Sequence, residues 1–375
     1  MVFSFRKLGK RFFILINVVL CLIFLLSCLQ PWLNPERFWF LGFLSLAFPY
    51  LMVLVAAFIL FWLIAKWKFM LISIVTLLLA YQQIGVLFSL KKSAFEIEKK
   101  ENNLRVMTWN VKGFQGITAD NELKKGNAAH IIALIDKLKP DVVCFQEFGQ
   151  YDSPIVKRNY VKDMQNIGFK YNVQSRDYNR GGIWGYSSGL AIFSRSPFVR
   201  TKRMQFTSSI ESVLYADFVL GNDTVRVFTT HLQSFKFMEN DYRDIEKIKN
   251  NDDSLVEASY NIFTKMKRAF RNRGAQADMI RPLLDSCPYP EIITCDMNDV
   301  PSSYSYWQLR SKRKDAFLEK GRGIGRTFLS IAPTLRIDYV LFDDRFSIHQ
   351  FKIGTQPYSD HLPLIADFEL KPKAR

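Results

Sequence analysis

Side chains suited to acid–base or metal chemistry stand within or just after several apolar runs of this sequence. These runs have the composition of β-strands, and the last of them, 357–370, alternates as a final strand would. The polar positions are Asn110, Glu147, His231, Asp296 with Asn298, Asp338, and Asp360 with His361. Taken singly, each has an ordinary explanation as a turn residue or a surface carboxylate. Repeated on strand after strand, they indicate a site, because buried polar groups are costly unless they satisfy one another or a metal ion.

The donor types favour one class of metal ion. Carboxylate and amide oxygens from Glu147, Asp360 and Asn110 suit Mg²⁺ or Mn²⁺, which keep bound waters and contact substrate phosphate. No Cys/His cluster in the sequence has the spacing of a zinc site. Cys144 and Cys295 stand inside apolar runs, where a buried and inert thiol is expected.

These polar positions require a strand-rich scaffold. Strands are predicted at 104–111, 141–148, 188–197, 213–220, 224–233, 291–299, 335–343 and 357–370. Helical spacing is present in "AAHIIALIDKLKP" (128–140), which ends at Pro140, and in the polar stretch 239–284. Several strands are apolar on both faces, so the pattern predicts two sheets packed face to face and covered by helices.

An ordered set of short motifs connects these strands to a known family. The motifs "TWNV", "FQE", "GLAIFSR", "TTHL", "DMND", "RIDYV" and "SDHLPL" occur in the order found in the endonuclease/exonuclease/phosphatase superfamily. The sequence resembles this superfamily, which includes DNase I-like nucleases and neutral sphingomyelinases, over residues 104–370. The resemblance implies an α/β four-layer sandwich of two mixed sheets flanked by helices. It also implies a metal-dependent phosphodiesterase or phosphomonoesterase.

The resemblance assigns a metal ligand and a group that acts on water. Glu147 resembles the principal ligand of Mg²⁺ or Mn²⁺, with Asn110 beside it and Asp360 approaching the metal. Asp296 resembles the residue that orients or deprotonates the attacking water, and Asn298 would position the phosphate. These roles make chemical sense because an anionic phosphodiester must be neutralised before water attacks it.

The resemblance also assigns two histidines. His361 resembles the catalytic histidine at the scissile phosphate, and Asp338 would orient it. His231 resembles a histidine that contacts a phosphate oxygen or assists the leaving group. One position departs from the family pattern, because Cys295 replaces the Gly that usually precedes the Asp-x-Asn motif. We expect activity to survive this change if the backbone at Cys295 is ordinary β, since only a positive φ would require Gly.

The first 92 residues are predicted to be a membrane anchor. Apolar segments at 12–29, 38–65 and 69–90 each reach the roughly 20 residues that a helix needs to cross a bilayer. A cleaved signal peptide is the alternative for the first segment, but its apolar core would be long and two further segments follow. No acid or Arg stands inside the spans, so transport is not expected.

Basic residues give the expected orientation of this anchor. Residues 1–93 hold nine basic residues and one acidic residue, in a chain whose formal net charge is +16. Their positions before the first span and after the second favour the cytoplasm for both places. Three crossings then put the following domain outside the cytoplasm of a bacterial-type inner membrane, although Lys91 and Lys92 count against this. Residues 93–103 are predicted to be a linker, and 104–375 the catalytic domain.

Two further positions are candidates for substrate contact. Arg326 lies in the Gly-rich "KGRGIGRTF" (320–328) and would bind phosphate, although a surface turn explains it equally well. Trp307 would stack on a base or reach a membrane interface, with core packing as the alternative.

The expected partners are a phosphoester substrate and a membrane, and no protein partner is predicted. A tethered, nuclease-like phosphodiesterase acting on nucleic acid is the leading expectation. A lipid phosphodiesterase of sphingomyelinase type, acting on phospholipid, is the close alternative. A catalytically silent binding module with the same fold is the third possibility, and it predicts that site residues are missing.

Overall fold

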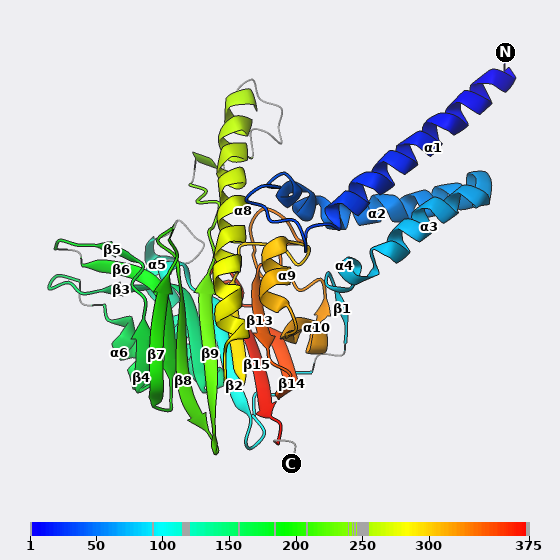
Figure 1. Cartoon of the computed structure of the whole chain (residues 1–375). Coiled ribbons are helices and arrows are strands. Elements are labelled where there is room, and N and C mark those ends of the chain that lie inside the picture. Colours follow the sequence, from blue (N-terminus) through cyan, green and yellow to red (C-terminus); the bar gives the residue numbers. More distant parts are fainter. Residues whose placement is uncertain are drawn as a thin grey trace. The chain divides into compact units, whose positions relative to one another are not determined.

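The chain folds into two compact units, which are described separately. The computed structural model describes residues 2–91, 94–114, 121–156, 158–183, 185–207, 209–238, 240, 241, 243, 245 and 255–372 (Figure 1). The smaller unit contains residues 1–88, 238–275 and 300–307. The larger unit contains residues 89–237, 276–299 and 308–375.

Two mixed β-sheets form the larger unit. One sheet has the strand order β11 (Lys314–Asp315), β13 (Asp338–Phe342), β10 (Glu291–Asp296), β9 (Asp223–His231), β8 (Ser212–Leu220) and β7 (Phe198–Gln205). The other has the order β14 (Phe346–Ile353), β15 (Leu364–Leu370), β2 (Leu104–Asn110), β3 (Val142–Tyr151), β6 (Tyr186–Ser194) and β4 (Tyr171–Gln174), and β5 (Tyr178–Arg180) also pairs with β6. A short pair joins β1 (Ser89–Leu90) to β12 (Arg322–Gly323). Every strand predicted from the sequence has a counterpart here.

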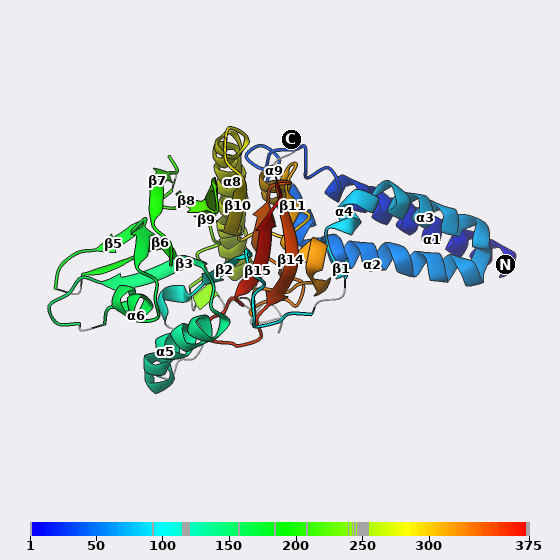
Figure 2. The ribbon, with the colours of Figure 1, turned by 90° about the horizontal axis from the view of Figure 1, so that it is seen from below.

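Apolar side chains from both sheets make one core between them. Val106 and Ile192 of the second sheet belong to the same buried cluster as Val227 and Ile292 of the first. A second cluster lies on the other face of the second sheet, where α5 (Asn121–Leu138) and α6 (Tyr160–Asn166) cover it (Figure 2). The short α10 (Ala316–Lys320) adds Phe317 to the core between the sheets. This arrangement confirms the predicted sandwich of two mixed sheets flanked by helices.

Seven of the described strands escaped the sequence analysis, namely β4, β5, β7, β14 and the two-residue strands β1, β11 and β12. Four of them, β4, β7, β11 and β14, end the strand orders of the two large sheets. Edge strands have one side open to water and commonly carry charged residues, which blunt aggregation. The strand β7, "FVRTKRMQ", is almost entirely exposed and therefore lacks the apolar signal on which strand prediction depends.

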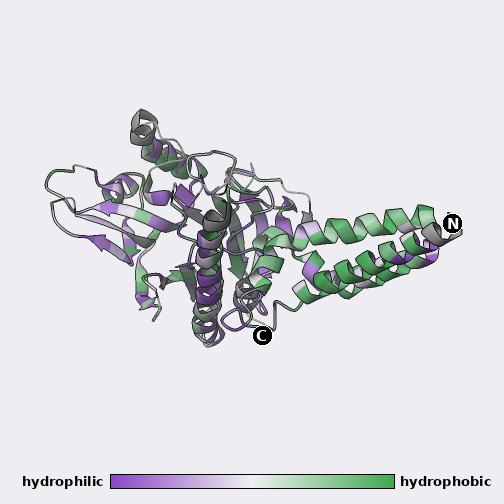
Figure 3. Ribbon diagram, turned by 90° about the horizontal axis from the view of Figure 1, so that it is seen from above, coloured by the Kyte–Doolittle hydropathy of each residue, from purple (hydrophilic) through white to green (hydrophobic). Residues whose placement is uncertain are grey.

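Long apolar helices characterise the smaller unit. It contains α1 (Val2–Ser27), α2 (Leu41–Lys66), the 3₁₀ turn η1 (Trp67–Phe69), α3 (Met70–Leu79) and α4 (Tyr81–Gly85). Two stretches, Lys7–Ser27 and Leu41–Leu79, are long and apolar enough to cross a membrane. Figure 3 shows the hydrophobic colouring along α1, α2 and α3. Apolar side chains such as Leu60 and Ile64 are exposed, and such surfaces are typical of contact with lipid or another apolar partner.

The third predicted span, 69–90, is not one continuous helix. It is divided into α3 and α4, because Ala80 between them leaves the helical conformation, with φ −93° and ψ 11°. The ten residues of α3 rise about 15 Å, which is half the thickness of a bilayer core. The three crossings on which the expected orientation depends therefore remain a prediction.

The smaller unit also includes segments that the sequence analysis placed in the catalytic domain. Phe43 of α2 stacks on Phe263 of α8 (Leu255–Asp285), with ring centroids 5.2 Å apart, and meets Phe270 edge-on at 5.1 Å. The hydroxyls of Ser45 and Ser302 are hydrogen-bonded at 3.1 Å. Within the smaller unit, α2 is thus packed against α8 and Ser302, and the predicted domain boundary at residue 92 remains a prediction.

Candidate active site

Strand register brings three predicted residues together in the first sheet. Asp296 at the end of β10 is the register partner of His231 at the end of the parallel strand β9. It is also the register partner of Asp338, the first residue of the antiparallel strand β13. The three side chains therefore lie at one end of the sheet, as the sequence pattern predicted.

The second sheet contributes Asn110, which links the two sheets. Asn110 ends β2 and is 1% exposed. Its Nδ2 donates a hydrogen bond to Asp296 Oδ2 at 2.9 Å and contacts Glu147 Oε1 at 3.3 Å. The backbone N–H of Lys112 donates to Asn110 Oδ1 at 3.0 Å, which fixes the orientation of the amide. Asn110 thus donates to both carboxylates from its buried position.

The backbone of Glu147 is unusual. Its φ is 51°, a left-handed conformation that is uncommon for residues other than Gly. The pairing of β3 with β6 shifts register between Phe145 and Phe148, as in a β-bulge. A bulge re-aims a side chain, and the Glu147 side chain is 40% exposed although β3 is otherwise mostly buried. Strain of this kind is concentrated at functional sites.

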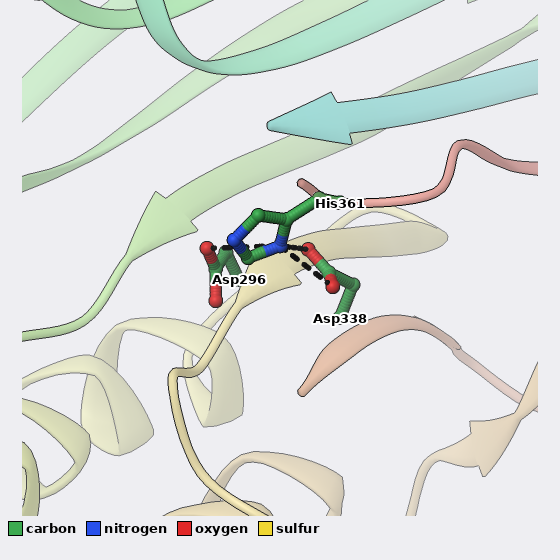
Figure 4. A group of neighbouring side chains, drawn as sticks. All are labelled: Asp296, Asp338 and His361. Carbon is green, nitrogen blue, oxygen red and sulfur yellow. Dashed lines mark hydrogen bonds and ion pairs between the residues drawn. The ribbon is translucent and has the colours of Figure 1, made fainter. Parts of the chain in front are cut away.

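His361 lies between two carboxylates at the centre of the site (Figure 4). Its Nδ1 is 3.0 Å from Asp338 Oδ2 and 3.6 Å from Asp296 Oδ2. Burial disfavours the charged imidazolium, but the nearby carboxylates of Asp338 and Asp296 outweigh it and raise the pKa of His361 to about 10. The predicted Asp338–His361 pair is therefore present as a buried, hydrogen-bonded pair with a protonated ring.

Three residues that the sequence analysis did not single out hold this pair in place. The indole Nε1 of Trp109 donates to the backbone oxygen of His361 at 2.8 Å. Thr327 Oγ1 accepts from the backbone N–H of Asp338 at 3.1 Å. Ser359 Oγ accepts from the backbone N–H of His361 at 3.4 Å and donates to the backbone oxygen of Asn110 at 2.8 Å. None of these three side chains is ionisable, so their types did not suggest a place in the site. Only the structure shows that they support it.

His231 faces the same centre from the side of Glu147. Its Nε2 is 3.6 Å from Asp296 Oδ2 and 3.8 Å from Glu147 Oε1. This nitrogen is buried and makes no hydrogen bond with any described residue. A buried ring nitrogen without a partner is costly, so it is available to a bound group.

Two groups of residues are candidates for a divalent cation. Asp296, Asp338 and His361 each offer a ligand atom, and these atoms lie within 4.8 Å of one another. The His361 Nδ1 and the Asp338 carboxylate already bond each other, so this group is better explained as an oriented histidine than as a metal centre.

Glu147 and its neighbours fit a hard cation better. Among the described residues, the only ion-pair partner of Glu147 is His231, so its half-exposed carboxylate has no Lys or Arg to neutralise it. Asp296 adds a second carboxylate next to the same amide of Asn110. Carboxylate oxygens with unbalanced charge suit Mg²⁺ or Mn²⁺.

Three other predicted residues have partners that were not expected. Asp360 Oδ2 forms an ion pair with Lys112 Nζ at 2.8 Å. Arg326 uses its guanidinium on backbone oxygens, those of Phe328 at 2.8 Å and of Leu329. Asn298, with φ 51°, donates from Nδ2 to the Leu232 backbone oxygen at 3.0 Å and so joins the loops after β9 and β10. Their proposed contacts with metal or phosphate remain predictions.

The remaining two sequence predictions concern Trp307 and Cys295. Trp307 lies on α9 (Tyr304–Arg310) and belongs to the smaller unit, so its contact with substrate stays a prediction.

Cys295 is inside β10 and pairs with Tyr339 and Thr230 in regular register. Its φ is not positive, so the Cβ is tolerated at the position where the family has Gly. Cys295 and Cys144 are both buried, as expected, and burial raises the pKa of their thiols, that of Cys144 to about 12.

Comparisons with known proteins agree with this geometry. A model of the Endonuclease/Exonuclease/phosphatase family matches residues 107–361, and a model described as Domain of unknown function (DUF8431) matches residues 10–87. A search of curated proteins gave no match.

Solved structures with the same fold are distant in sequence. An endonuclease/exonuclease/phosphatase from Beutenbergia cavernae is 21% identical with a TM-score of 0.50, over 72% of each chain. The human Nocturnin catalytic domain with bound sulfate is 15% identical with a TM-score of 0.51, over 72% of this chain and 94% of that one. A family protein from Leptotrichia buccalis is 14% identical with a TM-score of 0.50, over 71% of this chain and 100% of that one.

Proposed function

The chain belongs to the endonuclease/exonuclease/phosphatase family, and on that premise we propose that it is a nuclease-like phosphodiesterase tethered to a membrane. Members of this family are hydrolases that act on phosphoester bonds. The observation that carries the proposal is the meeting of both sheets at Asp296. Asn110 reaches Asp296 from one sheet, and His231 and His361 approach the same oxygen, Oδ2. The alternative of a silent binding module is disfavoured, because it predicts missing site residues and none of the expected site residues is missing.

The two histidines would bind the phosphate. His361 is held by Asp338 with its ring protonated, so it would stabilise negative charge on a phosphate oxygen. Water adds to phosphorus, the bond from phosphorus to the leaving oxygen breaks, and Asp296 takes the proton of the water. His231 Nε2 would give the leaving oxygen its proton. These assignments follow the family pattern and the distances within the site.

A divalent metal ion would be held by Glu147, with Asn110 and Asp360 beside it. When bound, Mg²⁺ or Mn²⁺ would neutralise the phosphate and polarise its oxygens. For Asp360 to reach the ion, its carboxylate has to leave Lys112 or bind through its other oxygen. For Asn110 to bind the ion directly, its amide has to rotate so that Oδ1 faces the ion. In its present orientation it would act on the ion only through its hydrogen bond to Glu147.

The function is tested with purified, detergent-solubilised protein and a panel of substrates. We expect hydrolysis of single-stranded DNA or bis(4-nitrophenyl) phosphate with Mg²⁺ or Mn²⁺, and loss of turnover with EDTA that added Mg²⁺ reverses. The Glu147→Gln variant keeps the side-chain shape and removes the charge, so it should need far more Mg²⁺ for any remaining turnover. Turnover that neither EDTA nor Glu147→Gln affects would contradict the metal site.

A lipid phosphodiesterase is the second candidate, because two stretches of the same chain are apolar enough to cross a bilayer. Sphingomyelin in the same panel distinguishes the two candidates. Hydrolysis of sphingomyelin in preference to DNA would replace the nuclease-like proposal with the lipid one.

The location of the catalytic domain is a separate prediction. Basic residues at the start of α1 and in the turn between α2 and α3 favour the cytoplasm, which places the rest of the chain on the other side after three crossings. We expect an alkaline phosphatase fusion at the C-terminus to be active in a bacterial host and a green fluorescent protein fusion to be dark. The reverse pattern would place the catalytic domain in the cytoplasm, as two crossings would.

A further inference from the structure

A pocket of about 270 Å³ lies beside the proposed reaction centre, within the larger unit. Glu147 and His231 line it, and both belong to the proposed catalytic machinery. Tyr178, Tyr186 and Glu211 line it as well, and they have no part in the proposed reaction. A group that occupies this pocket therefore touches the reaction centre and these additional residues together.

Glu211 has an acceptor that no described residue uses. The residue is 7% exposed, and it immediately precedes β8. Its Oε1 is 3.5 Å from Nζ of Lys236, whose side chain is 54% exposed. Its Oε2 is buried and has no hydrogen-bond partner among the described residues. A buried carboxylate oxygen without a donor is destabilising, so a donor from a ligand would satisfy it.

The other acid that lines the pocket, Asp177, does not have this property. Its Oδ1 accepts hydrogen bonds from Arg203 Nη2 at 2.9 Å and from Ser212 Oγ at 2.7 Å. Its Oδ2 also accepts from Ser212 Oγ, at 2.9 Å. Asp177 is thus explained by the packing of β7 and β8, whereas Glu211 is not.

Aromatic side chains provide a wall for the same pocket. Tyr178 is 48% exposed, and its ring centroid is 6.4 Å from that of Tyr186. Tyr186 in turn packs on Tyr151 at 5.1 Å. Flat rings of a ligand stack on such exposed aromatic faces.

We infer that this pocket binds the organic group esterified to the scissile phosphate, and that Glu211 selects a polar ring whose N–H or O–H donates to it. A nucleoside is a ligand of this class. The inference rests on the proposed phosphodiesterase function, and it names the side of the substrate that the motif residues do not contact. The hydrocarbon chains of a phospholipid offer neither a donor to Glu211 nor a flat ring to stack on Tyr178.

Two substrates with the same leaving group test the inference. Bis(4-nitrophenyl) phosphate has no N–H or O–H donor on its organic groups, whereas the 4-nitrophenyl ester of thymidine 5′-phosphate has both kinds. In Glu211→Ala, kcat/KM for the thymidine ester should fall about 10- to 100-fold, as for a lost hydrogen bond to a charged group, and kcat/KM for bis(4-nitrophenyl) phosphate should not change. Glu211→Gln keeps an acceptor oxygen and should recover part of the loss. Glu319→Ala, an exposed acid on α10 that does not line the pocket, is the matched control and should leave both values unchanged.

The other outcomes distinguish failure of the pocket inference from failure of the phosphodiesterase proposal. Equal losses on both substrates in Glu211→Ala, or no loss on either, would overturn the inference and leave the phosphodiesterase proposal intact. If the wild-type protein hydrolyses neither substrate, the proposed function fails, and binding of thymidine 5′-monophosphate by calorimetry then decides on the pocket. Weaker binding by Glu211→Ala than by the wild type supports the pocket, and equal binding overturns it.

Discussion

Replacement of His361 should lower kcat by about 10²- to 10⁴-fold, the range typical for removal of a positioned acid or base. His361 is 5% exposed, and its Nδ1 bonds the buried carboxylate of Asp338 at 3.0 Å. Loss of the ring removes the group proposed to neutralise the phosphate. It also leaves Asp338 buried without its partner, and breaking such a pair costs about 3–5 kcal/mol of stability. His361→Ala is thus expected to lose stability as well as turnover.

Two variants separate these effects. His361→Asn retains an N–H near the position of Nδ1 and should keep most of the stability while turnover stays low. Asp338→Asn keeps the histidine but removes the charge that holds it protonated, and it should lower kcat by a smaller factor. Turnover of bis(4-nitrophenyl) phosphate and thermal unfolding by circular dichroism are the measurements. The proposed role of His361 requires kcat to fall by at least about 10²-fold. A folded His361→Asn protein with a smaller loss of kcat would contradict this role.

The second large effect is expected at Gly42, in the first turn of α2. A Cβ at Gly42 would lie 2.4 Å from Cγ of Phe270, whose ring is buried. A Cβ at Gly274 in α8 would lie 2.6 Å from Cγ of Pro35. Both glycines therefore allow α2 and the turn before it to approach α8 within the smaller unit.

Replacement of Gly by Ala should lower the stability at Gly42 and Gly274 and should not lower it at a helix position with open space around the Cβ. Inside a helix the substitution normally stabilises by about 0.5–1 kcal/mol. At Gly42 and Gly274 the overpacking should outweigh that gain and destabilise by about 1–3 kcal/mol. Gly9 in α1 has no atom within 4 Å of its Cβ position, so Gly9→Ala is the matched control.

Thermal unfolding of the whole, detergent-solubilised protein measures the difference. The midpoint should fall for Gly42→Ala and for Gly274→Ala, and it should not fall for Gly9→Ala. Equal midpoints for Gly42→Ala and Gly9→Ala would show that Phe270 makes room without strain, and that the two segments do not pack as closely as the structure indicates.

Much of the fold was predictable because buried strands carry a strong local signal. Strands such as β2, β10 and β15 are apolar for most of their length; β2 and β10 were predicted within three residues, and β15 begins seven residues later than predicted. The edge strands β7 and β14 were missed because β7 is almost entirely exposed and most residues of β14 are only partly buried, so neither strand alternates clearly. The third apolar segment was predicted as one helix, since composition does not show that the helix ends at Ala80.

The sequence by itself determined which residues end the strands and the order in which the family motifs occur, because both are local properties. Only the tertiary structure decided what each side chain meets. Register placed His231 and Asp338 beside Asp296, and a bulge turned Glu147 outwards. Asp360 forms an ion pair with Lys112, the guanidinium of Arg326 donates to backbone oxygens, and Glu211 lines a pocket. Except for Arg326, whose acceptors are two and three residues away, these pairings join residues far apart in the chain, so they depend on packing and register.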